Sequence, residues 1–178
     1  TKIEMWNDGG DDSYTRYDYD DYGNVISSMD GLGRISRVFY EDMGTYAETA
    51  INPLGHVQTY DYDLGTGNLL SSERSGVTTS YEYDIFGRIV KEILPYDSFY
   101  VPTRTYTYDF DGEAPERVMV QQKTTANNTL QASYYYDGLG NLVQMRQRTD
   151  VDDVISNLFY DVDLRVVRVQ QPYFTARG

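Results

Sequence analysis

Apolar and polar residues alternate along most of this chain with a period of two. In Tyr17-Asp18-Tyr19, Tyr60-Asp61-Tyr62 and Tyr81-Glu82-Tyr83, two tyrosines flank one acidic residue. Successive side chains of a β-strand point to opposite faces of its sheet, so the two tyrosines share one face and the acid lies on the other. The pattern predicts half-buried strands.

A polar turn signal follows each tyrosine pair. An acidic residue is followed three positions later by glycine, as in Asp20 to Gly23 and Asp84 to Gly87. The carboxylate can accept backbone N–H bonds, and glycine can adopt the left-handed conformation needed to leave a type I turn. Each copy of the signature therefore predicts a strand, a tight turn and a second strand.

The signature recurs along most of the chain, which predicts a repeat protein. Clear copies begin at Tyr17, Tyr60, Tyr81 and Tyr134, and weaker copies begin at Phe39, Tyr106 and Phe159. A second turn class without paired tyrosines lies between them, at residues 30–34, 52–56 and 73–77. Because strand direction reverses at every turn, we expect a meander with the tyrosine-marked turns along one edge and the others along the opposite edge.

The spacing of the turns predicts strand lengths and a division of the array. Turns begin at positions 20, 30, 41, 52, 63, 73 and 84, which leaves about six or seven residues per strand. Beyond residue 84 the hairpins lengthen, with far tips expected near residues 96–102, 126–128 and 150–153. We predict a single array of residues 1–178, made of a lead-in strand (1–16), short regular repeats (17–94) and longer hairpin repeats (95–178).

Fold class follows from these elements and from the composition. The chain holds 19 tyrosines and 15 glycines, which favours strands and tight turns over helices. A short helix over residues 116–123 is the alternative for that stretch, but Val118-Met119-Val120 favours a strand. About fourteen strands in one open sheet exceed the roughly ten that persist without curling. We predict an all-β, antiparallel meander of hairpins that forms a curled ribbon.

Charge and hydropathy exclude several classes of partner. A net charge of -13 repels phosphate backbones and anionic lipid headgroups, so we expect no nucleic acid and no membrane insertion by this segment. The sequence has no apolar run of about 20 residues and no apolar signal region at its start. Either the protein is cytosolic or its targeting segment is expected outside this chain. Cysteine is absent, which excludes disulfides and thiolate metal sites.

Clusters of carboxylates are the first candidates for chemistry. Paired carboxylates serve glycosidases when they face each other across a cleft, and three groups in this chain are acidic enough: Asp18, Asp20 and Asp21; Asp109, Asp111 and Glu113; and Asp150, Asp152 and Asp153. The same residue types recur at every turn, so we interpret them as turn caps and solvated neighbours. The segment from Asp18 resembles the start of a calcium loop but has Tyr22 at the fifth ligand and Met29 at the twelfth.

The remaining candidates also have simpler interpretations. His56 is the only histidine and occupies the position after a turn glycine, which elsewhere holds Asn24, Arg34 or Arg88, so it is predicted to be a turn residue. Tyrosines at period two form a packing ladder rather than a row of ligand platforms. Asn127-Asn128-Thr129 fits an N-glycosylation acceptor at a loop tip. We predict no catalytic residue, no cofactor and no metal site.

The motif Tyr-x-Tyr-Asp-x-x-Gly-Asn/Arg-hydrophobic resembles the YD repeats of bacterial Rhs proteins, of the B and C components of insecticidal toxin complexes, and of teneurins. The resemblance covers residues 17–168. It implies a long β-ribbon that spirals into a hollow shell, which in the bacterial proteins encloses a toxic polypeptide. A complete shell in that family uses many more repeats, so we expect a fragment or a short relative. The family's self-cleavage motif is not recognisable here, and no protease activity is carried over.

These observations lead to two hypotheses of function. The first is a non-catalytic scaffold, part of a β-shell that encloses or presents a toxin-like polypeptide in a secreted or surface protein of a bacterium. Its expected partners are neighbouring repeats of a longer chain, a partner shell component and an enclosed toxin polypeptide. The alternative is an extracellular repeat module that binds carbohydrate or protein through its tyrosine-bearing surface.

Overall fold

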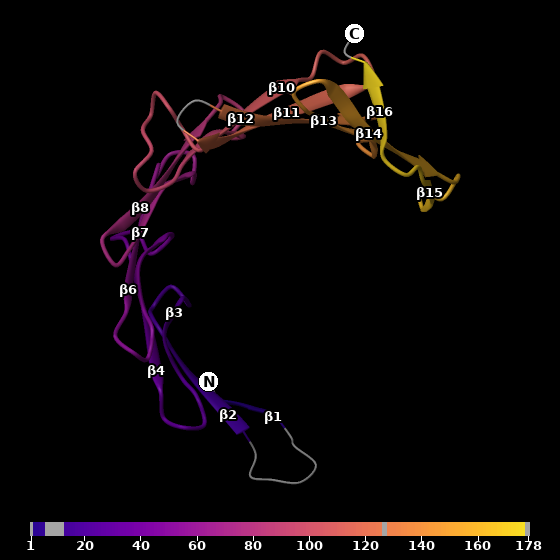
Figure 1. Cartoon of the computed structure of the whole chain (residues 1–178). Helices are drawn as coiled ribbons and strands as arrows, with labels where there is room; N and C mark the ends of the chain where they lie inside the picture. The colour runs from indigo at the N-terminus through magenta and orange to yellow at the C-terminus, as the bar shows by residue number, and fades with distance from the viewer. Residues whose placement is uncertain (1, 6–12, 126–127, 177–178) are drawn as a thin grey trace. The chain divides into compact units, whose positions relative to one another are not determined.

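The computed structural model describes residues 2–5, 13–125 and 128–176 (Figure 1). The chain divides into two compact units. The first unit comprises residues 1–81 and the second residues 82–178. Each unit is built from consecutive antiparallel strands, and no helix occurs in the part of the chain that the structure describes. No segment among those residues meets the length and hydropathy of a membrane-spanning helix.

The first unit is an antiparallel meander in which neighbouring strands are consecutive in sequence. Its strands are β1 (Lys2–Met5), β2 (Ser13–Tyr19), β3 (Val25–Met29), β4 (Ile35–Tyr40), β5 (Ala47–Ile51), β6 (Val57–Tyr62), β7 (Leu69–Arg74) and most of β8 (Val77–Tyr83). Tyrosine-marked turns and the other turns therefore alternate between the two edges of this sheet, as the turn spacing predicts.

The second unit continues the same architecture with longer hairpins. Its strands are β9 (Ile89–Ile93), β10 (Arg104–Asp109), β11 (Glu116–Thr125), β12 (Asn128–Tyr136), β13 (Leu142–Arg148), β14 (Asp152–Tyr160), β15 (Val166–Val169) and β16 (Tyr173–Ala176). The last strand leaves the meander, because β16 pairs with the first half of β14, on the edge away from β13, while β15 pairs with the second half (Figure 1).

The all-β, antiparallel meander is confirmed, and so are most of the predicted element positions. Residues 116–123 belong to β11, so the strand interpretation of that stretch is correct and the helix alternative is wrong. The tip near 96–102 falls between strands as predicted, and the last tip lies at residues 149–151, because Asp152 and Asp153 already belong to β14. Residues 126 and 127 lie outside the described residues, and with them the predicted glycosylation acceptor.

The predicted alternation of faces is clearest in β4 and β6. Exposed and half-buried side chains alternate strictly along both strands. The pairing register then shifts by one residue just before the tyrosine-marked turns, for example between Phe39 and Tyr40 and between Asp61 and Tyr62. A one-residue bulge beside a type I turn is the standard geometry of such hairpins, and it lets the strand twist into its turn.

The turn predicted at residues 73–77 is of a different type from the one expected. Arg74 pairs with Val77, so Ser75 and Gly76 alone connect β7 and β8. Both residues have positive φ, at 55° and 76°, which is the geometry of a two-residue type I′ hairpin. Glu73 therefore stays in the strand, opposite Thr78, and caps no turn. The correction leaves the strand order unchanged.

The copy of the signature that ends at Asp109 also departs from the predicted turn cap. Asp109 is the last residue of β10 and lies opposite Arg117 of β11, whose guanidinium it binds through Nε at 2.7 Å and through Nη2. The connection instead runs over residues 110–115, where Asp111 accepts the backbone N–H of Glu113 at 2.9 Å. Because this loop is longer, Asp109 caps no turn and instead forms a cross-strand ion pair with Arg117.

The long connection between β9 and β10 is closed by a small polar cluster. Asp97 accepts the hydroxyl of the buried Thr103 at 2.5 Å and forms an ion pair with Lys123 of β11. Thr103 Oγ1 in turn accepts the backbone N–H of Leu94 at 2.8 Å. Ion pairing with Lys123 and the bond from Thr103 lower the pKa of Asp97. The cluster fixes both ends of a loop that has no strand partner of its own.

Apolar burial within the described part of the chain is small. Ile155 is its one apolar side chain in the buried class, with 4% of its surface exposed, and no side chain there falls below 2%. The apolar residue before the turn glycine is exposed in most repeats: Tyr22, Leu32, Met43, Leu54, Phe86 and Leu139 are all at least 73% exposed. Each unit is a single layer whose faces and edges are only partly covered by its own chain.

Candidate functional site

The repeated turn is the first feature that carries the sequence signature. In the turn that follows β8, Asp84 Oδ1 accepts the backbone N–H groups of Phe86 and Arg88 at 2.9 and 3.0 Å. The backbone closes the same turn, because Gly87 N–H donates to the Asp84 carbonyl at 3.0 Å. Gly87 has a φ of 77°, as the spacing of acid and glycine predicts. The acid thus satisfies the donors that a tight reversal leaves unpaired.

The residue after the glycine completes the turn by binding the second oxygen of the same acid. The donors at this position are the side chains of Asn24, Arg34, Arg88, Asn141 and Arg165. The turn headed by Asn52 differs in its polar pair, and there the amide Nδ2 lies 3.1 Å from Nδ1 of His56. An amide nitrogen needs an acceptor where a carboxylate needs a donor. His56 is a turn residue, as predicted. Its Nδ1 can accept a hydrogen bond from the amide of Asn52, which explains why histidine suits this position.

Acid should weaken these turns. Hydrogen bonds from the backbone of Arg34 and Arg165 lower the pKa of Asp30 and Asp161, respectively. A carboxyl group whose pKa is lowered by folding stabilises the folded chain at pH values above its unfolded pKa of about 3.9. This stabilisation is lost as the pH falls through the folded pKa. We expect the urea midpoint of unfolding to decrease between about pH 5 and about pH 3.

The matched control for this acid effect is Asp30→Asn together with Asp161→Asn. Asn52 already shows that an amide oxygen accepts the same two backbone N–H groups, at 3.0 Å each. The doubly substituted chain should lose less stability over the same pH range than the wild type. An equal loss in both chains would show that these turn acids do not set the acid sensitivity.

The second tyrosine of the signature has a specific role in the sheet. Tyr108 and Tyr160 donate their hydroxyls to the carbonyls of Ile89 and Leu142 at 2.9 and 2.8 Å, and Tyr40 reaches Val25 at 3.4 Å. Each acceptor is the first residue of the strand that precedes the tyrosine's own strand. The hydroxyl therefore anchors one hairpin to the beginning of the strand before it, which phenylalanine cannot do.

Tyr160→Phe tests this anchor. Removing the hydroxyl leaves the Leu142 carbonyl without this donor and should lower the free energy of unfolding by about 1 kcal/mol. Urea unfolding followed by circular dichroism measures the change. Tyr96→Phe is the control, because Tyr96 is fully exposed and should give no change. Equal stabilities of the Tyr160→Phe chain and the wild type would mean that the anchor bond contributes nothing.

One turn carries a residue that its conformation disfavours. Leu164 occupies the glycine position of the Asp161 turn and has a φ of 61°. This conformation costs about 1–2 kcal/mol for a residue with a Cβ. Because Leu164 is 52% exposed, little packing is lost with its side chain, and Leu164→Gly should raise the free energy of unfolding by about 0.5–1 kcal/mol. A lower urea midpoint in the variant would contradict this expectation.

Ring contacts confirm that paired tyrosines share one face. The rings of Tyr60 and Tyr62 lie 6.4 Å apart, and Tyr62 stacks on Tyr46 at 5.1 Å with an interplanar angle of 22°. In the second unit, the Arg88 guanidinium lies 4.3 Å from the Tyr108 ring while it also binds Asp84. The tyrosines are therefore part of the packing of the sheet, as the ladder interpretation predicts.

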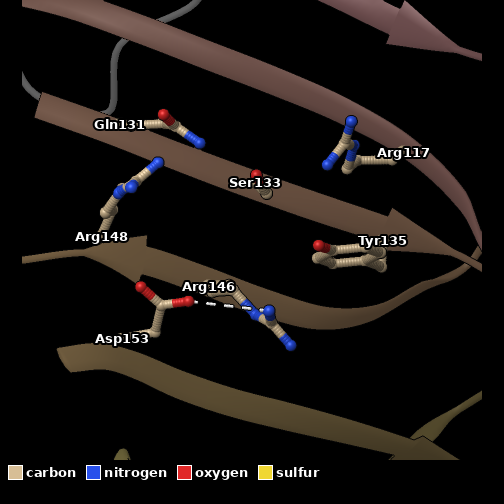
Figure 2. Close-up of a pocket in the computed structure, with 7 residues that line it drawn as sticks. All are labelled: Arg117, Gln131, Ser133, Tyr135, Arg146, Arg148 and Asp153. Atoms are coloured by element: carbon tan, nitrogen blue, oxygen red, sulfur yellow. Dashed lines mark ion pairs between the residues drawn. The ribbon is translucent and has the colours of Figure 1, made fainter. Parts of the chain in front are cut away.

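The opposite face of the second unit contains a polar hollow of about 230 Å³ (Figure 2). Gln131, Ser133 and Tyr135, at alternate positions of β12, form its floor. Arg148 and Arg146 lie directly across from Gln131 and Ser133 on β13. The ends of the hollow are completed by Arg117 of β11 and Asp153 of β14.

The hollow is unusual in charge for so acidic a chain. It is lined by three guanidinium groups and one carboxylate. Asp153 Oδ2 lies 3.6 Å from Arg146 Nη1, an ion-pair distance longer than a good hydrogen bond. The Nε of Arg146 is buried and has no hydrogen-bond partner. Sequence reasoning did not find this site, because its residues come from four strands and match no motif.

Carboxylates of the candidate clusters bind neighbouring groups in the structure. Asp20 caps its turn through both oxygens, and Asp18 lies on the strand with Arg16 at 3.6 Å. Asp153 faces Arg146, while Asp152 donates its backbone N–H to Thr149 at 3.1 Å. Within the described ranges, no three acidic or imidazole side chains are grouped as metal ligands.

Comparison with known proteins identifies one segment of the chain as a known type of repeat. The family model described as RHS Repeat matches residues 65–98, which include the Asp84 turn. The matched segment agrees with the resemblance of the repeated signature to Rhs repeats. A search of curated protein sequences finds no match.

Solved structures share the fold of nearly the whole chain. The crystal structure of TcdB2-TccC3 is similar over 98% of this chain, with a TM-score of 0.79 and 11% identity. A Photorhabdus luminescens Tc holotoxin pore is similar over 94%, with a TM-score of 0.64 and 18% identity. The YD/Rhs repeats described here span only 12% and 10% of those two chains.

Proposed function

We propose that this chain is a structural wall segment of a larger β-shell, which encloses or presents a toxin-like polypeptide in a secreted or surface-displayed bacterial protein. One observation carries the proposal: each unit is a single sheet layer, and among its described residues almost no apolar side chain is buried. A sheet face stays stable in water when another layer or a continuing array covers it. In the described part of the chain, that covering is lacking, so neighbouring repeats or a partner component must supply it.

The exposed turn residues support the same proposal. Tyr22 and Met43 project at one edge of the first sheet, and Leu32 and Leu54 at the other, all at least 73% exposed. Such regular apolar exposure along both edges is typical of surfaces that are covered in an assembly. The similarity to components of Tc toxin complexes supports a role in such an assembly.

A non-enzymatic role agrees with how the polar groups are used. Asp84 and Asp137 bind backbone N–H groups of their turns, and their side-chain partners are the residues that follow the turn glycines. The alternative of a carbohydrate-binding module needs free aromatic platforms, whereas Tyr46, Tyr60 and Tyr62 contact one another. The scaffold hypothesis therefore has the stronger support, and glycan-array binding that is lost on replacing exposed tyrosines would favour the module.

The open reading frame that contains these repeats tests the proposal. We expect a polypeptide several times longer, with further repeats and a variable tail, whose electron cryo-microscopy structure shows these residues as part of a closed wall. The isolated chain should bind an apolar dye such as ANS, and the longer polypeptide should bind far less per residue. A gene that ends with this array, together with a monomer that binds no dye, would overturn the proposal.

A further inference from the structure

We propose that the polar hollow on β11 to β14 is a docking site for an acidic polypeptide segment, with an aspartate or glutamate side chain of that segment held between Arg146 and Arg148. The scaffold role requires no such recognition, so this inference goes beyond the proposed function. It rests on the geometry, charge and unused donors of the hollow (Figure 2).

The first step is the charge balance of the second unit. Residues 1–81 hold 14 acidic and 5 basic residues, whereas residues 82–178 hold 14 and 10. Arg117, Arg146 and Arg148 all lie at the hollow, and the one carboxylate that lines it is Asp153. Even after Asp109 neutralises Arg117, one positive charge at the hollow remains uncompensated.

The second step is the set of donors that remain available. The side chain of Arg148 has no hydrogen bond or ion pair with any residue that the structure describes, and Arg146 Nε is buried without an acceptor. The Nη2 of Arg146 contacts Gln144 only at 3.5 Å. A planar guanidinium can bind both oxygens of a carboxylate, and two such groups beside a glutamine and a tyrosine offer more donors than Asp153 can use.

The third step selects the occupant. A volume of about 230 Å³ admits a carboxylate side chain with a few waters, since a water occupies about 30 Å³ of liquid. The hollow lies on an open sheet face, where an extended segment can lie across the strands. With four more acidic than basic residues in this unit, a polyphosphate meets repulsion beyond the hollow, whereas a single carboxylate gains the local attraction within a Debye length of about 8 Å.

Peptide binding to the whole chain tests the inference. The probe is a blocked peptide with one glutamate among neutral residues, and its matched control carries glutamine at the same position. We expect the glutamate peptide to bind at least about tenfold more tightly, and Arg148→Gln and Arg146→Gln each to weaken it by about tenfold, measured by calorimetry or by NMR shifts of residues in β12 and β13.

Two further variants separate specific docking from general attraction. Arg168→Gln removes the same charge at a distant site, where Arg168 lies 3.7 Å from the Phe159 ring, and should leave binding unchanged. Arg148→Lys keeps the charge but loses the planar fork and should recover only part of the affinity.

Three outcomes would overturn the docking site. The first is equal binding of the glutamate and glutamine peptides, and the second is equal weakening by Arg168→Gln and Arg148→Gln. The third is inorganic phosphate or a phosphopeptide that binds as tightly as the glutamate peptide, which would make this a general anion site. None of these results bears on the wall-segment proposal, which concerns the uncovered apolar residues.

Discussion

Gly67→Val should destabilise the chain by about 3 kcal/mol in urea unfolding. Gly67 has a φ of 79°, a conformation that costs a residue with a Cβ about 1–2 kcal/mol and a β-branched one at least as much. An added Cβ would also lie 2.7 Å from the hydroxyl oxygen of Tyr46, and the Tyr46 ring stacks on Tyr62. The substitution therefore adds a steric clash against a packed aromatic pair to the backbone strain.

Gly55→Val separates these two contributions. Gly55 has nearly the same φ, 80°, but a Cβ there meets nothing within 4 Å. We expect a loss of about 1–2 kcal/mol from the backbone conformation alone. If both variants lose the same stability, the stacked rings of Tyr46 and Tyr62 move aside at no cost, and they contribute nothing to the rigidity of that turn.

Ile155→Ala should cost about 2–3 kcal/mol, near the lower end of the range for removing a buried aliphatic side chain. Ile155 of β14 is 4% exposed, and it lies opposite Arg146 of β13 and Tyr173 of β16. The return of β16 to β14 therefore creates the one buried apolar position described in this chain. Urea unfolding followed by circular dichroism measures the change.

Val167→Ala is the matched control for that substitution. Val167 lies on β15 and is 62% exposed, so its truncation should change stability by less than about 0.5 kcal/mol. A cost below about 1 kcal/mol for Ile155→Ala would mean that β16 does not protect β14 in solution. Hydrogen exchange at β14 amides would then be fast as well.

The role of β16 also bears on the docking site. Ile155 and Arg146 are cross-strand partners, so the apolar position that β16 covers lies beside the guanidinium groups of the hollow. Loss of β16 packing would be expected to loosen β14 and, with it, Asp153. Peptide binding and Ile155→Ala stability are therefore measured best in the same preparation, where a weakened site and an unfolded strand can be told apart.

The repeats were predictable from sequence because their determinants are local. Asp84 and Gly87 lie three residues apart, and the partner Arg88 is the next residue, so the chemistry of the turn is complete within five positions. Period-two tyrosines predicted the shared face that Tyr60 and Tyr62 occupy. Alternation and turn spacing together specify an antiparallel meander, and they do so before any contact between distant residues is known.

Tertiary structure alone decided what depends on exact register. A shift of one residue moves every side chain of a strand to the other face, so a tip placed only to within two residues cannot tell whether Arg148 faces Gln131. The same holds for the reach of Tyr160 to Leu142 and for the burial of Ile155 by a returning strand. Hydrogen bonds within a turn depend only on neighbouring residues in the sequence. Cross-strand neighbours depend on the exact lengths of several hairpins, and the pattern of turns does not determine those lengths.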